Sequence, residues 1–123
     1  QIINMQTKKT GKLFNFCLLA VGILAKKGVK EKKFLSILGE EIGLLFQLAD
    51  DFLDIKGNKK LVGKPTNKDY KKGKSTLTKL MGYDKAHNYA NNLKKKILLK
   101  LKKHGKKGKD LSDTVEFILS RSF

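Results

Sequence analysis

The sequence predicts an all-α fold. Apolar residues recur at helical spacing through most of the 123 residues, whereas no alternating strand pattern of useful length appears. One proline and no tryptophan favour a helical chain with few sharp turns. A hydrophobic content of 40% is adequate for a single domain with a modest core.

Two long helices are expected first. The segment of about residues 10–25 is apolar nearly all round, so it should be buried, and Cys17 within it should be a small core residue. The segment of about residues 30–55 carries apolar residues at helical spacing from Phe34 to Phe52. A stop signal for this helix follows at residues 57–58, Gly-Asn.

Three further helices are expected after a loop at residues 57–73, which is rich in glycine and lysine. A short helix covers about residues 75–81. The next, about residues 84–104, has one apolar face and an opposite face that is almost all lysine, the expected outer face of a bundle. Residues 105–108 should be a linker, and Asp110 or Ser112 should cap a last helix that ends near Ser120.

The net charge of +17 is extreme for this size and implies an anionic partner, such as phosphates, nucleic acid, an acidic membrane surface or an acidic protein. A general lysine bias explains the charge as well, because lysines occur in all segments. No nucleic-acid module with interleaved aromatics is present, so no specific nucleic-acid partner is expected. The best apolar run, residues 16–25, is about half the length needed to span a bilayer. A cytoplasmic protein without a transmembrane segment is expected.

The candidate site is a carboxylate cluster, Asp50, Asp51 and Asp54, at the end of the second predicted helix. Spacings of three and four place these side chains on neighbouring faces, where like charges repel and oppose the helix dipole. A solvated helix end is one interpretation. The other is a site for Mg²⁺, which prefers one or two carboxylates completed by water and phosphate. Nine lysines and one acid follow between Ile55 and Lys79, a pattern that favours a metal-bound polyphosphate.

Two shorter patterns flank this cluster. Lys9-Thr10-Gly11 precedes the first helix, where Thr10 could be an N-cap or the free N–H groups could bind phosphate. Residues 73–76, Gly-Lys-Ser-Thr, look like the end of a Walker A loop, but Lys68 stands where the earlier glycine is required. A nucleotide-binding P-loop is therefore rejected, although Lys74 can still hold a phosphate.

The order of these pieces resembles the second half of a trans-polyprenyl diphosphate synthase of the bacterial farnesyl/geranyl diphosphate synthase type. The resemblance covers nearly the whole chain. The motifs that carry it are Lys9-Thr10-Gly11, Gly43-x-x-Phe46-Gln47-x-x-Asp50-Asp51-x-x-Asp54, Gly57, Gly63-Lys64, Asp69 and Gly73-Lys74-Ser75-Thr76.

The resemblance implies an isoprenoid-synthase-type helical bundle with a central cavity, and a homodimer. It implies Mg²⁺-dependent head-to-tail condensation of an allylic diphosphate with isopentenyl diphosphate. By resemblance, Asp50 ligates Mg²⁺ directly, and Asp51 and Asp54 order water around it. The remaining implied roles are diphosphate binding by Lys9, Lys64 and Lys74, and oxygen dipoles beside the allylic cation from Thr10 and Gln47.

One departure from the family is large. The family has an earlier aspartate-rich motif, basic residues for isopentenyl diphosphate and chain-length determinants, and none of these is in this chain. Residues 1–123 are therefore expected to be the C-terminal part of a single polyprenyl synthase domain, inactive without its N-terminal half. The alternative, of a different class, is a non-catalytic basic helical module that binds phosphate-rich or nucleic-acid partners.

Overall fold

The computed structural model describes residues 10–61 and 77–121, except the side chains of residues 57–61. All regular secondary structure in these described residues is helical, and no strand occurs among them. The predicted all-α fold is confirmed. The elements are α2 (Lys12–Leu24), α3 (Val29–Leu61), α4 (Leu77–Met81), α5 (Tyr83–Lys102), the 3₁₀ helix η2 (Gly105–Gly108) and α6 (Lys109–Ser120).

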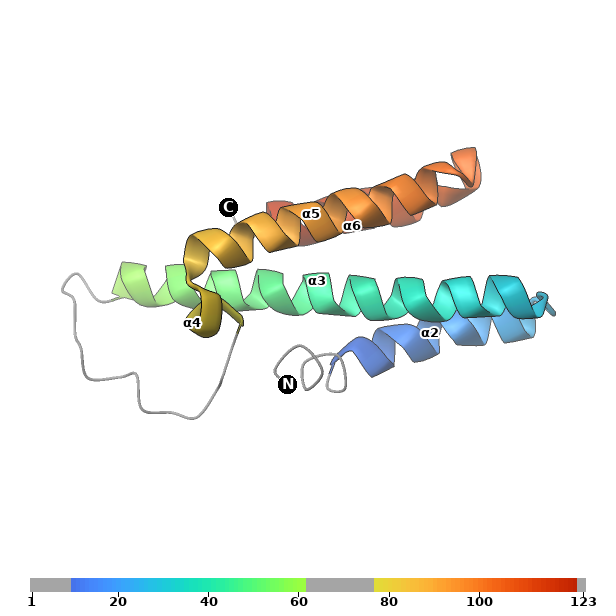
Figure 1. Ribbon diagram of the computed structural model, residues 1–123, viewed down its shortest axis with the longest axis horizontal. Coiled ribbons are helices and arrows are strands. Elements are labelled where there is room, and N and C mark those ends of the chain that lie inside the picture. The colour runs from blue at the N-terminus through green and yellow to red at the C-terminus, as the bar shows by residue number, and fades with distance from the viewer. Residues whose placement is uncertain (1–9, 62–76, 122–123) are drawn as a thin grey trace.

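Helix α3 is the axis around which the other elements are arranged (Figure 1). Its 33 residues extend over roughly 50 Å at 1.5 Å per residue. Helix α2 runs back along the first part of α3 on one side, and α5 and α6 pack together on the other. The short α4 crosses near the start of α5 and also contacts α3.

Helix α3 continues through Gly57-Asn58 to Leu61, so the predicted stop at these two residues is wrong. An internal glycine costs a helix only about 1 kcal/mol. A long helix held by tertiary packing can carry that cost, because most helical stability in proteins comes from burial of a face.

The core lies between α3, α5 and α6, with Leu77 of α4 at one end. The predicted apolar face of the helix at about 84–104 is confirmed as buried or partly buried, and α6 buries an apolar face as well. The largest fully buried side chains are Phe52, Leu38, Leu45, Leu48, Ile97, Leu119 and Val115.

The expectation that the first helix is buried is wrong for the described part of the chain. Phe14 and Leu18 of α2 pack against the core, and Gly22 is buried. Phe16 remains 67% exposed and Leu24 82% exposed, and Cys17 is exposed too. A helix that is apolar all round needs partners on several sides, and α3 covers one of them.

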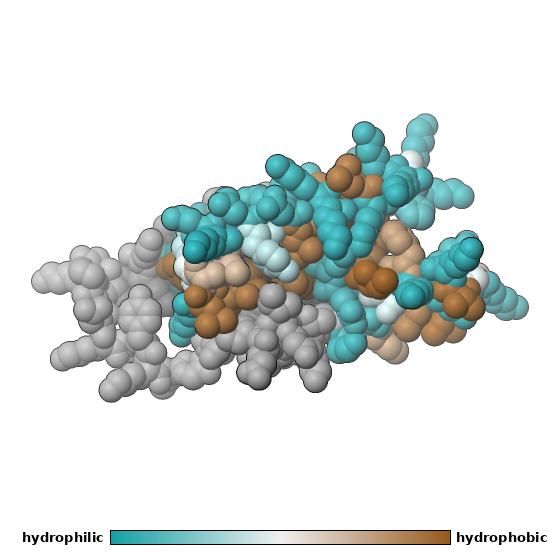
Figure 2. All heavy atoms as spheres, in the orientation of Figure 1, coloured by the Kyte–Doolittle hydropathy of each residue, from teal (hydrophilic) through white to brown (hydrophobic). Residues whose placement is uncertain are grey.

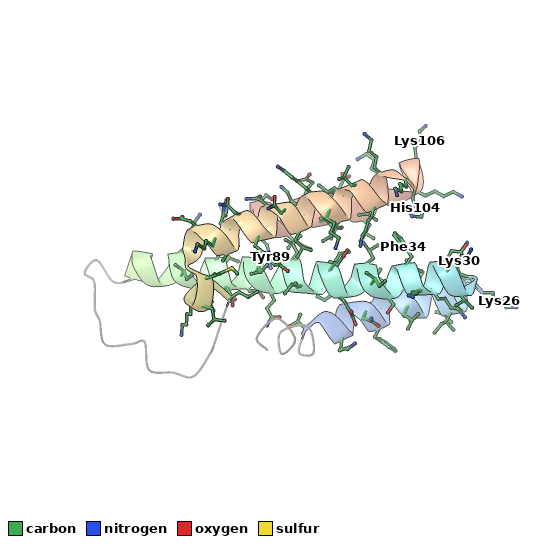
Figure 3. The ribbon with its side chains drawn as sticks, viewed as in Figure 1. Lys26, Lys30, Phe34, Tyr89, His104 and Lys106 are labelled. Atoms are coloured by element: carbon green, nitrogen blue, oxygen red, sulfur yellow. The ribbon has the colours of Figure 1, made fainter. Side chains whose placement is uncertain are left out.

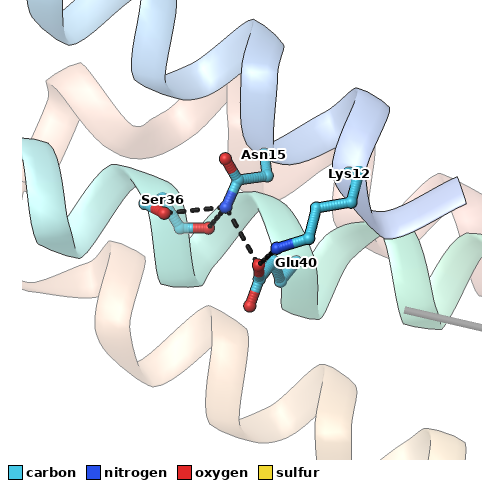
Figure 4. Close-up of polar contacts among 4 residues, drawn as sticks. All are labelled: Lys12, Asn15, Ser36 and Glu40. Atoms are coloured by element: carbon cyan, nitrogen blue, oxygen red, sulfur yellow. Dashed lines mark hydrogen bonds and ion pairs between the residues drawn. The ribbon is translucent and has the colours of Figure 1, made fainter. Parts of the chain in front are cut away.

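The backbones of α2 and α3 pack closely against each other at two glycines of α3. A Cβ atom added at Gly39 would lie 2.6 Å from Asn15 Cα, and one added at Gly43 would lie 2.7 Å from Gly11 Cα. Polar contacts close the same interface (Figure 4). Asn15 Nδ2 donates to Ser36 Oγ at 2.7 Å, and Lys12 Nζ lies 2.7 Å from Glu40 Oε1.

The turns of α2–α3 and α5–η2 meet at the same end of the molecule. The rings of Phe34 and His104 point toward each other there, with centroids 5.1 Å apart (Figure 3). Lys26, Lys30 and Lys106 project from this end. The aromatic contact therefore joins the first turns of α3 to the turn between α5 and η2.

The start of α6 differs from the prediction. Residues 105–108 form the 3₁₀ helix η2 rather than an irregular linker, and Gly108 is the N-cap of α6 without a side-chain cap. The expected caps Asp110 and Ser112 lie inside the helix, and Ser112 Oγ donates to the Gly108 carbonyl at 2.9 Å. A Cβ at Gly108 would lie 2.7 Å from the Leu101 carbonyl oxygen, so this close approach favours glycine at the cap.

In the described ranges, no helix is long and apolar enough to cross a membrane.

Gly39→Ala should lower the free energy of unfolding by about 2 kcal/mol. The added methyl group overlaps the backbone of α2, and overpacking of this kind costs about 1–3 kcal/mol. Lys33→Ala is the matched control on the exposed face of α3 and should change the free energy of unfolding by less than about 0.5 kcal/mol. Urea denaturation measures both, and equal midpoints would contradict the close packing of α2 on α3.

Candidate functional site

The predicted carboxylates lie on α3 where the C-terminal end of α6 approaches it. Asp50 and Asp51 are half-buried, and Asp54 is exposed. Asp50 Oδ1 accepts a hydrogen bond from Arg121 Nη2 at 2.6 Å. Because α3 continues to Leu61, Asp50 and Asp54 lie well before its last turn. The helix-dipole argument for a metal at this site therefore does not apply, since the dipole acts within the last turn.

Arg121 is a residue of this site that the sequence reasoning missed. Its guanidinium carbon lies 4.4 Å from the centroid of the Phe46 ring, and its Nε donates to the Ile118 carbonyl at 3.3 Å. A signal was present in the sequence, because Arg121 is the single arginine among 28 lysines and arginines. The helical pattern could not show that the end of α6 returns to α3.

Gln47 supplies an unsatisfied polar atom to this region. Its Oε1 is buried and has no hydrogen-bond partner within the described part of the chain. An unpaired buried acceptor costs about 1–3 kcal/mol, so Gln47 Oε1 is an atom that a ligand or water could satisfy. Gln47 and Asp50 are three residues apart and therefore lie on adjoining positions of one helical face.

The start of α2 reaches the same part of α3. The rings of Phe14 and Phe46 are 5.4 Å apart, and Gly11 lies against Gly43. Thr10, half-buried, precedes Gly11, and Gly43 is about one helical turn before Gln47. The structure thus brings Thr10, Gln47 and Asp50 to one region, where α2, α3 and α6 meet.

Lys9, Lys64 and Lys74 lie outside the described residues, as does most of the loop that follows α3. The lysine face of α5 is described, and Figure 2 shows hydrophilic side chains gathered over that helix. Part of this face pairs with neighbouring helices rather than only meeting solvent. Lys100 and Lys96 lie 2.7 and 3.0 Å from Glu41 Oε1 on α3, and Lys94 lies 3.1 Å from Glu116 on α6.

The carboxylates fit a divalent cation by their chemistry, although no group of three or more acidic, histidine or cysteine side chains converges on one point within the described ranges. Mg²⁺ needs no such cage, because it keeps several waters and takes one or two carboxylates together with substrate phosphates. Asp50 already faces a cationic group, the guanidinium of Arg121. The residues present therefore suit a metal completed by ligands from elsewhere.

Comparison with known proteins identifies the family. Residues 1–116 match the polyprenyl synthetase family. The chain belongs to this family. The resemblance inferred from the motifs around Gln47 and Asp50 is thereby confirmed.

Individual relatives of this polyprenyl synthetase chain bear synthase and transferase names. A farnesyl diphosphate synthase of Haemophilus influenzae is 36% identical over 98 residues, which are 77% of this chain and 33% of that protein. A farnesyl diphosphate synthase of Micrococcus luteus is 32% identical over 83 residues, 68% of this chain and 28% of that protein. A dimethylallyltranstransferase of Fischerella ambigua is 28% identical over 118 residues, 96% of this chain and 34% of that protein. The chain thus spans about a third of the length of these relatives.

Gln47→Leu should raise the free energy of unfolding by about 1 kcal/mol, because it removes a buried oxygen that lacks a partner. Asn15→Leu is the matched control, since Asn15 bonds Ser36 and Glu40 and should destabilise when it is replaced. Urea denaturation compares the two variants. Loss of stability in both would mean that Gln47 Oε1 has a partner.

Proposed function

We propose that the chain is the C-terminal part of a prenyltransferase that condenses an allylic diphosphate with isopentenyl diphosphate, head to tail and with Mg²⁺. The observation that carries this proposal is the junction of α2, α3 and α6. There Asp50 faces a cationic group, and the unpaired oxygen of Gln47 lies one helical turn away. Membership of the polyprenyl synthetase family supports it, as do relatives named farnesyl diphosphate synthase.

The reaction breaks the C–O bond of the allylic diphosphate, and the bonding electrons leave with the diphosphate. The allylic cation then alkylates the double bond of isopentenyl diphosphate, and a proton is lost. When bound, Mg²⁺ stabilises the negative charge that develops on the leaving diphosphate. This charge is larger in the transition state than in the ground state, so stabilising it lowers the barrier.

The proposed role of each residue follows from the chemistry of its side chain. Asp50 would hold the metal directly, and Asp51 and Asp54 would order the water around it. The ammonium groups of Lys9, Lys64 and Lys74 would donate charge-assisted hydrogen bonds to diphosphate oxygens. Thr10 and Gln47 would direct oxygen dipoles at the allylic cation, and for Gln47 the available atom is the buried, unpaired Oε1.

The partner that completes the site is the N-terminal part of the same domain. It would supply the first aspartate-rich motif and the isopentenyl diphosphate site, and it would cover the apolar side chains that α2 exposes. Charge alone does not select nucleic acid as a partner, because several lysines of α5 pair with glutamates of neighbouring helices. The whole protein would act in the cytoplasm as a homodimer.

Asp50→Ala should lower turnover by orders of magnitude in the protein that joins this chain to its N-terminal part, because it removes a direct metal ligand. Asp54→Ala, the matched change one turn along the helix, should cost less. Steady-state kinetics with an allylic diphosphate and isopentenyl diphosphate at varied Mg²⁺ measures both. A larger loss for Asp54→Ala would contradict the roles assigned, and full activity in Asp50→Ala would overturn the proposed function.

The 123 residues alone should associate or be partly molten and show no detectable prenyl transfer, because α2 leaves five large apolar side chains exposed: Leu13, Phe16, Val21, Ile23 and Leu24. Joining the N-terminal part should restore order and Mg²⁺-dependent activity. For this reason, the unfolding of the Gly39→Ala and Gln47→Leu variants is also measured in the joined protein. Light scattering, near-UV circular dichroism and a transfer assay report the outcome. A monodisperse monomer with a sharp thermal transition, or steady synthesis of a longer prenyl diphosphate, would contradict it.

A further inference from the structure

Arg121 contacts two residues of α3, Asp50 and Phe46. One amino group of its guanidinium bonds Asp50 Oδ1 at 2.6 Å, and its guanidinium carbon lies over the Phe46 ring, 4.4 Å from the centroid. The residue stands directly after α6, 71 positions along the chain from Asp50. The end of the last described helix is therefore tied to the carboxylate to which the proposed function assigns the metal.

The composition of the chain points to a requirement for guanidinium at this position. All other basic side chains except histidine are lysines, 27 in number, so the chain uses lysine wherever a positive charge alone suffices. A guanidinium differs from an ammonium in its planar fork and in its ability to stack on an aromatic ring. Arg121 uses several N–H groups of its guanidinium, one to Asp50 Oδ1 and one to the Ile118 carbonyl, and its guanidinium carbon also lies over the Phe46 ring.

The ion pair competes with a metal for the same oxygen. Both partners are partly accessible, with 28% of the Arg121 side chain and 48% of the Asp50 side chain exposed. A pair of this kind contributes up to about 1 kcal/mol, so an arriving divalent cation can displace it. After displacement, the contacts of Arg121 with the Phe46 ring and the Ile118 carbonyl remain to hold it nearby.

We propose that Arg121 is a positioning residue of the metal site, an internal counter-ion that orients and neutralises Asp50 until the metal replaces it. The inference rests on the proposed function, because it takes Asp50 to be a metal ligand. It adds that α6 senses the occupancy of the site, since Arg121 at its end contacts both Asp50 and Phe46 in the metal-free protein and keeps only the Phe46 contact with α3 in the loaded one.

The test measures Mn²⁺ binding by electron paramagnetic resonance in the joined protein, without diphosphate. Arg121→Gln should tighten the Asp50-dependent part of Mn²⁺ binding by about threefold to fivefold, because the competing charge is gone. Arg121→Lys keeps the charge and should fall between this variant and the parent protein. Lys95→Gln removes an equal charge from the exposed face of α5 and should leave the affinity unchanged.

A second pair of variants separates this inference from the proposed function. Asp50→Asn should weaken Mn²⁺ binding strongly, and adding Arg121→Gln to it should give no further gain. If Asp50→Asn weakens binding but Arg121→Gln leaves it unchanged or weakens it, the counter-ion role is overturned and the metal site stands. If Asp50→Asn has no effect on Mn²⁺ binding, both are overturned. Thermal unfolding of Arg121→Gln is followed in parallel, and a lowered midpoint with unchanged Mn²⁺ affinity would make Arg121 purely structural.

Discussion

The packing of α3 on two sides is the constraint on which the rest of the structure depends. On one side its leucines and Phe52 form the core with α5 and α6. On the other side its glycines let the backbone of α2 approach to distances that no Cβ atom would allow. A helix held along both faces can run for 33 residues and accept an internal glycine. Its length places the start of α2 and the end of α6 against the same few turns.

The candidate site is a consequence of that geometry. Gln47 and Asp50 are neighbours on one face of α3, but the groups that meet them come from distant parts of the sequence. Phe14 brings α2 against Phe46, and Arg121 at the end of α6 lies over the same ring. The polar atoms of the site are not satisfied alike, because Asp50 has a cationic partner whereas Gln47 Oε1 is buried without one. A ligand could bond the Gln47 oxygen directly, whereas a cation that binds Asp50 must first displace the Arg121 guanidinium.

Several of the lysines that give the chain its positive charge form ion pairs between helices. Glu41 is a nearly buried carboxylate on α3 that accepts two lysines of α5, and Glu40 at the preceding position pairs with α2 through Lys12. Adjacent glutamates thus tie α3 to opposite neighbours. The exposed lysines of the α2–α3 and α5–η2 turns, such as Lys26 and Lys106, lie at the end of the molecule where α3 begins (Figure 3). The positive charge therefore has a structural part between helices and a solvated part at the end of the bundle.

The sequence by itself determined the helical class, the apolar faces of α5 and α6 and the family, because these depend on periodicity and on local spacing such as that from Phe46 to Asp54. It also singled out Asp50 by its spacing to Asp54, and Gln47 through the family resemblance. Only the tertiary structure decided the continuation of α3 past Gly57, the glycine cap of α6, the exposure of Cys17 and the contact of Arg121 with Asp50. Each of these depends on what packs against a residue from far along the chain, and a helical pattern records which face is apolar but not which neighbour covers it.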